Sequence, residues 1–138
     1  MTNILDNDIC DKLCAAAKNK ADEMGINISF AICDEKGLIV LFRRFDGAPV
    51  FSNVLVPKKA YTSAVMFMPT EKLAMLCKDG GPLMGIQNND SKITLVSGGH
   101  PLFIDGKCVG GIGVGGGRGN EDPIIAEHVV SIFNELIK

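Results

Sequence analysis

Residues 96–114 read VSGGHPLFIDGKCVGGIGV, and this stretch decides how the rest of the chain is organised. Residues 101–104 and 107–114 are largely apolar, and Asp105-Gly106 stands between them. A two-residue Asp-Gly turn accepts positive φ at both positions and joins antiparallel strands. The pattern therefore predicts a β-hairpin with strands over 101–104 and 107–114.

The second strand of this hairpin carries three glycines in its interior, Gly110, Gly111 and Gly113. Glycine weakens a strand because it costs backbone entropy and offers no side chain to pack. It is useful where a helix, another subunit or a flat ligand must approach the backbone closely. We therefore expect the strand over 107–114 to lie well inside the sheet, with its bare backbone covered.

Outside the hairpin, helical and strand patterns alternate along the chain. The expected elements are a helix capped by 6–8 and ended by Gly25, strands over 26–33 and 38–44, helices over 58–65 and 70–77, a short strand over 93–96, and a last helix with Ile125, Val129, Ile132 and Leu136 on its apolar face. Strands joined by hairpins favour an antiparallel sheet with helices packed on it. The chain is thus predicted to form one α+β domain over residues 1–138, with a five-stranded antiparallel sheet flanked by helices.

The composition excludes several classes of function. The chain has 138 residues, with 14 basic and 16 acidic side chains and a formal net charge of −2. The charges are well mixed, so there is no basic patch of the kind that binds nucleic acid. No apolar run approaches the roughly 20 residues of a membrane span, and the polar, acidic segment 1–11 does not resemble a signal peptide. Five cysteines without a Cys-x-x-Cys pair favour reduced thiols in a cytoplasmic protein.

Several segments of the chain resemble the signature of the GlcG/HbpS/PduO C-terminal family. The hairpin supplies 98–102 (GGHPL) and 105–116 (DGKCVGGIGVGG), and 121–127 matches the acidic start of the family's final helix. Further matches, in the family's order, are 43–48 (RRFDGA), 59–64 (KAYTSA) and 80–85 (GGPLMG). The resemblance covers nearly the whole chain. It implies a profilin-like fold and assembly into a homo-oligomer, a tetramer or an octamer.

The resemblance also implies a function, although fold families host many functions. By analogy with the family, the chain is expected to bind a small planar or anionic ligand, haem or a related tetrapyrrole. The family includes the C-terminal domain of a corrinoid adenosyltransferase and proteins encoded beside glycolate or diol utilisation enzymes, which implies an accessory role in such a pathway. Some relatives are lyases or deaminases of small carboxylic acids, so a small enzyme stays open as the alternative. An interaction module without a ligand is the third possibility.

His100 is the first candidate for a ligand site. It follows Gly98-Gly99 and precedes Pro101, in an expected loop beside the glycine-rich strand. A histidine there can ligate haem iron or transfer protons near neutral pH. The two glycines add no side-chain bulk, so we expect room for a ligand beside the imidazole. The family usually has an apolar or aromatic residue at this point, so His100 departs from its pattern, and the alternative is a partly exposed loop histidine.

Three further side chains are candidates for ligand binding: Lys59, Tyr61 and Arg118. Lys59 offers a point charge for a carboxylate or propionate, Tyr61 can stack or hydrogen-bond, and Arg118 can contact an anion. The alternative for the lysine and the arginine is a solvated surface. In the enzyme hypothesis His100 is the acid or base, and Lys59 or Arg118 holds the substrate carboxylate. Segment 111–116 matches G-x-G-x-x-G without the strand and acidic residue that must follow, so no nucleotide cofactor is expected.

Overall fold

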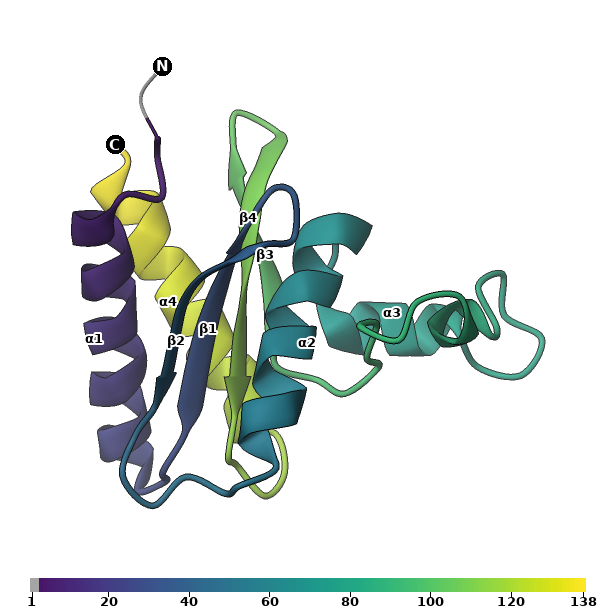
Figure 1. Cartoon of the computed structure of the whole chain (residues 1–138), viewed down its shortest axis with the longest axis horizontal. Helices are drawn as coiled ribbons and strands as arrows, with labels where there is room; N and C mark the ends of the chain where they lie inside the picture. The colour runs from purple at the N-terminus through teal and green to yellow at the C-terminus, as the bar shows by residue number, and fades with distance from the viewer. Residues whose placement is uncertain (1–2) are drawn as a thin grey trace.

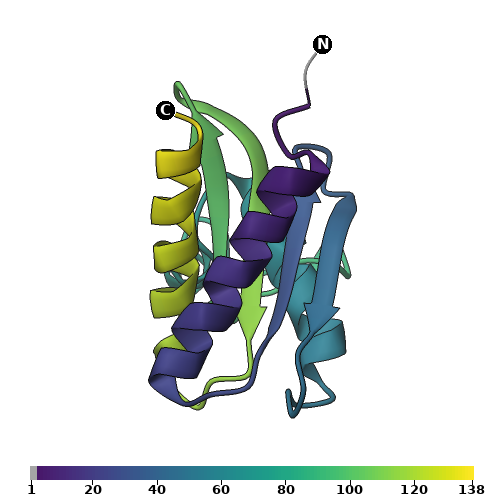
Figure 2. The same ribbon diagram turned by 90° about the vertical axis from the view of Figure 1, so that its left-hand side faces the viewer.

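The fold is an antiparallel sheet with helices on both faces, as the computed structural model shows for residues 3–138 (Figure 1). In chain order the elements are α1 (Asn7–Met24), β1 (Ser29–Asp34), β2 (Ile39–Arg44), α2 (Ser52–Met66), α3 (Thr70–Leu76), the 3₁₀ turn η1 (Ile86–Asn88), β3 (Gly99–Ile104), β4 (Lys107–Gly115) and α4 (Glu121–Leu136). Helices α1 and α4 lie side by side on one face of the sheet, and α2 covers the other face (Figures 1 and 2). No helix within residues 3–138 has the length and apolar character needed to cross a membrane.

The sheet has four strands in the order β2-β1-β4-β3, and all neighbouring strands are antiparallel. The α+β class and the interior position of β4 are confirmed, but the expected fifth strand over 93–96 is wrong. The N–H of Thr94 donates to Oγ1 of Thr62 on α2 at 2.9 Å, so this segment bonds to a helix side chain instead of a strand. One edge of the sheet is therefore β3, which begins at Gly99 and includes His100, a residue expected in a loop.

Two hydrophobic cores lie on the two faces of the sheet. The larger one, between the sheet and the pair α1 and α4, includes Leu13, Phe30, Ile112, Val129 and Phe133, all fully buried. The smaller one, between the sheet and α2, is built mainly from small residues: Ala31, Cys33, Val56, Ala60 and Ala64. The difference in side-chain size indicates that α2 packs much closer to the sheet.

The glycines of β4 explain this close packing of α2. A Cβ on Gly113 would lie 2.4 Å from the Val56 carbonyl oxygen, and one on Gly111 would lie 2.7 Å from the Ala60 carbonyl oxygen. Both distances are far below van der Waals contact, so any side chain here would push the helix away. The close approach predicted from the sequence is thus confirmed for these two positions, and the approaching group is the backbone of α2, which begins at Ser52.

Candidate functional site

Lys59 is buried at one end of the sheet, between α2 and β4. Its side chain is 1% exposed. The ammonium Nζ donates to the Val114 carbonyl oxygen at 2.7 Å and to Oδ2 of Asp122 at 3.2 Å. Lys59 is therefore neither the exposed point charge nor the solvated helix residue that the sequence suggested. It is the cation of a buried ion pair.

Asp122, the partner of Lys59, also holds the glycine loop that precedes α4. Its Oδ1 accepts the Gly117 N–H at 2.9 Å, and Oε1 of Glu121 accepts the N–H groups of Arg118 at 3.0 Å and Gly119 at 2.8 Å. Carboxylates are favoured in the first turn of a helix because they satisfy free N–H groups and face the positive end of the helix dipole. Sequence reasoning missed the role of Asp122, although the acidic start of the last helix was a visible signal.

Gly98 and Gly99 also meet at this end of the sheet. Gly98 has a φ of +120°, and a Cβ there would lie 2.4 Å from the Val114 carbonyl oxygen and 2.9 Å from Nζ of Lys59. A Cβ on Gly99 would lie 2.5 Å from the Lys59 carbonyl oxygen, and the Gly99 N–H donates to Oγ1 of Thr70 at 3.0 Å. The space left by these missing side chains is thus occupied by the protein itself, not left open for a ligand.

The electrostatics of this cluster follow from its burial. Burial lowers the pKa of Lys59, while the charge and the hydrogen bond of Asp122 oppose that shift. The Glu71 carboxylate also favours the ammonium, and its buried Oε1 has no hydrogen-bond partner within residues 3–138. The arrangement is a cation held between carboxylates and away from solvent, which is suited to fixing the loop before α4.

His100 lies on the opposite face of the sheet from Lys59. Successive residues of a strand point to opposite faces; Gly99 faces α2, and His100 pairs with Ile112, which belongs to the core under α1 and α4. The catalytic arrangement of the enzyme hypothesis, with His100 beside Lys59, is therefore not assembled within one chain.

The imidazole of His100 is half-buried and has a defined tautomer. Its Nδ1 lies 3.0 Å from the Pro101 carbonyl oxygen. A carbonyl oxygen only accepts hydrogen bonds, so Nδ1 carries the hydrogen and the lone pair of the neutral ring is on Nε2. A metal-binding histidine is usually oriented by a hydrogen bond of this kind, which the ring nitrogen that does not bind the metal donates. The residue can therefore act as a metal ligand or as a proton acceptor through Nε2.

Tyr61 lies away from both of these residues, beside the β1–β2 turn. Its ring fills the space over Gly37, its hydroxyl donates to the Asp90 carboxylate, and the Lys92 ammonium lies 4.5 Å from the ring centroid. The hydrogen bond to Asp90 raises the pKa of Tyr61 and lowers the pKa of Asp90. The ring also lines a hollow of about 100 Å³. Arg118 is exposed in the glycine loop, and no hydrogen bond or ion pair found within residues 3–138 joins its side chain to Tyr61 or His100.

Comparison with known proteins places these observations in context. A model of the family described as "Haem degrading protein HbpS-like" matches residues 5–131. A 15.0 kDa protein from the dhaT-dhaS intergenic region of Citrobacter freundii is 32% identical over 126 residues, which are 91% of this chain and 89% of the relative. Corrinoid adenosyltransferase PduO of the same species is 31% identical over 89% of this chain, which spans 37% of that protein. The crystal structure of a PduOC:heme complex superposes with a TM-score of 0.87 at 29% identity, covering 92% of this chain and 93% of that one.

Proposed function

This chain belongs to the HbpS-like family, and on that premise we propose that it is a homo-oligomeric protein that binds haem or a related tetrapyrrole. The observation that carries the proposal is the similarity, over almost the whole chain, to a PduOC structure that contains haem. An accessory role in the utilisation of a small molecule, of the glycolate, diol or corrinoid type, fits the similarity to the corrinoid adenosyltransferase PduO. The same proposal includes a cytoplasmic location.

His100 is the residue that we propose as the iron ligand. Neutral imidazole is the most common protein ligand of haem iron, and it binds through the nitrogen that carries the lone pair. The hydrogen bond from Nδ1 to the Pro101 carbonyl leaves Nε2 in that form. The imidazole is half-buried, and β3, the strand that carries it, is an edge strand with no further strand on its outer side. Bound haem would supply a redox-active iron at this position.

The porphyrin itself would need a surface larger than a single chain offers around His100. Three hollows in the part of the chain that the structure describes are lined by residues other than His100. We therefore propose that the porphyrin lies against the outer side of β3 and is enclosed by a second subunit. Large exposed apolar side chains, among them Phe51, Phe67 and Met75 at 63–65% exposure, support assembly, since such surface is commonly buried in an interface.

Titration with haemin tests the ligand and its site. We expect the Soret band of haemin to shift with a defined stoichiometry on addition of the protein. His100→Ala should weaken haemin binding and change the Soret band, because the proposed iron ligand is removed. His128→Ala is the matched control, because His128 is a half-buried histidine on α4 and we expect its loss to affect stability and not haem binding.

Three results would contradict parts of this proposal. Equal haemin affinity and spectra for the wild type and His100→Ala, with both proteins folded, would exclude His100 as the ligand. No Soret shift in the wild type would exclude haem. Sedimentation that shows a single species near 14.7 kDa at micromolar concentration would contradict the proposed assembly.

A further inference from the structure

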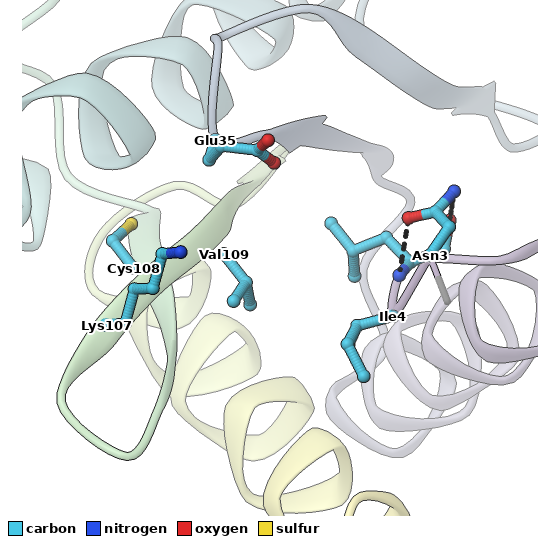
Figure 3. Close-up of a pocket in the computed structure, with 7 residues that line it drawn as sticks. Asn3, Ile4, Glu35, Lys107, Cys108 and Val109 are labelled. Carbon is cyan, nitrogen blue, oxygen red and sulfur yellow. Dashed lines mark hydrogen bonds between the residues drawn. The ribbon is translucent and has the colours of Figure 1, made fainter. Parts of the chain in front are cut away.

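A hollow of about 350 Å³ opens at the end of the sheet that lies opposite the Lys59–Asp122 pair (Figure 3). Three separate segments line it: residues 3–5 before α1, Glu35 in the β1–β2 turn, and 107–109 at the start of β4. Figure 1 shows both hairpin turns and the N-terminal segment together at this end. Its volume is in the range of small-molecule sites, and it takes no part in the proposed haem site.

The wall made by the N-terminal segment is held in place by several contacts. Leu5 is 5% exposed and packs over Gly110, where a Cβ would come within 2.8 Å of Cδ1 of the leucine. Oδ1 of Asn3 accepts the Leu5 N–H at 3.2 Å, and the Cys10 thiol donates to the Leu5 carbonyl at 3.6 Å. A Cβ at position 110 would also lie 2.3 Å from the Cys33 carbonyl oxygen, so this position needs a glycine. The Leu5 part of the wall is therefore fixed by packing against the sheet.

The hollow is lined by both apolar and charged side chains. Ile4, Leu5 and Val109 give an apolar surface, while Glu35 and Lys107 bring one negative and one positive charge from two different turns. Both charged side chains are exposed, and no ion pair within residues 3–138 joins them. An apolar surface that carries one charge of each sign is complementary to a molecule with an aliphatic body and a charge of each sign.

We propose that this hollow binds a small zwitterion of the amino-acid class. Its ammonium group lies at Glu35, its carboxylate lies at Lys107, and its aliphatic part covers Leu5 and Val109. The proposal is independent of haem binding, since His100 and the residues of this hollow lie in separate places on β3 and β4.

Isothermal titration calorimetry of the complete chain with three probes tests this site. 6-Aminohexanoate carries both charges, whereas hexanoate and hexylamine carry one each. We expect 6-aminohexanoate to bind at one site per chain and more tightly than either single-charge probe. Because exposed ion pairs contribute modestly, each charge should account for about a threefold difference in affinity.

Substitutions at the two charges then give opposite results. Glu35→Gln should weaken 6-aminohexanoate and hexylamine by about threefold and leave hexanoate unchanged, while Lys107→Gln should weaken 6-aminohexanoate and hexanoate and leave hexylamine unchanged. Glu127→Gln and Lys78→Gln, at exposed positions outside the hollow, are the matched controls and should change nothing. No saturable binding, equal affinities for the three probes, or variants that match the controls would each overturn the proposal. Haemin binding is expected to be the same in all four variants.

Discussion

Replacing Lys59 by methionine removes the buried ammonium while keeping a long, unbranched side chain. In the wild type Nζ donates to the Val114 carbonyl oxygen at 2.7 Å and to the Asp122 carboxylate at 3.2 Å, and only 1% of the side chain is exposed. Methionine can donate to neither oxygen. Lys59→Met therefore leaves a carbonyl and a carboxylate without this partner in a place that water does not reach easily.

The size of the effect follows from these contacts. A buried acceptor that loses its partner costs about 1–3 kcal/mol, and breaking a buried ion pair from one side costs about 3–5 kcal/mol. Asp122 keeps its bond from the Gly117 N–H at 2.9 Å, and burial disfavours the ammonium itself, as the lowered pKa of Lys59 indicates. Both facts place the expected loss at the lower end, about 3 kcal/mol. A domain stable by about 5–15 kcal/mol stays folded after such a loss.

Urea unfolding at neutral pH and fixed chain concentration measures the loss, and a second substitution tests its cause. Asp122→Asn removes the buried negative charge and keeps an oxygen for the Gly117 N–H. Added to Lys59→Met, it should therefore restore about 1 kcal/mol or more, because the uncompensated charge is gone. A loss below about 1 kcal/mol for Lys59→Met, or a double variant that is less stable than Lys59→Met alone, would refute the account of a buried ion pair.

Other parts of the structure lead to further expected outcomes. Gly113→Ala should cost about 2–3 kcal/mol in the same urea experiment, because its methyl would lie 2.4 Å from a backbone carbonyl of α2, whereas Gly119→Ala, with no contact closer than 3.8 Å, should cost less than about 0.5 kcal/mol; equal losses would contradict the packing argument. Tyr61→Phe should raise the pKa of Asp90, since the phenol hydrogen bond is the main cause of its lowering, and an NMR titration that finds the pKa unchanged would argue against that bond. Burial lowers the pKa of Lys59 below its ordinary 10.5, so in alkaline solution the unfolded chain binds more protons there than the folded chain, and wild-type stability relative to Lys59→Met should rise as the pH approaches 10.5; a difference that shrinks with pH would show the opposite shift.

The parts of the fold that were predicted correctly depend on neighbouring residues. Asp105 and Gly106 have φ values of +50° and +78°, as the predicted two-residue hairpin turn requires. Gly25 ends α1 in the left-handed conformation, with a φ of +70°, as a C-cap glycine does. In both cases the turn residue itself carries the information, so no distant contact is needed to predict it.

The incorrect and incomplete predictions involve partners that are distant in the sequence. Segment 93–96 has the composition of a strand, but its Thr94 N–H bonds to a threonine 32 positions earlier on α2. His100 was expected in a loop and lies instead in β3, opposite Ile112. Hydrophobic periodicity describes one segment at a time, so it gives no information on which distant group takes the backbone hydrogen bonds.

By itself the sequence determines the antiparallel hairpin, the close packing at the β4 glycines and the family to which the chain belongs. Only the tertiary structure decides that Lys59 is buried, because its carboxylate partner Asp122 is 63 positions away on another helix. It also decides that Gly98 meets the Lys59 ammonium and that His100 faces away from it. The physical reason is that the residue type alone does not decide whether a charged side chain is buried. The cost of removing the charge from water is offset only where the fold brings an opposite charge and a free carbonyl to it.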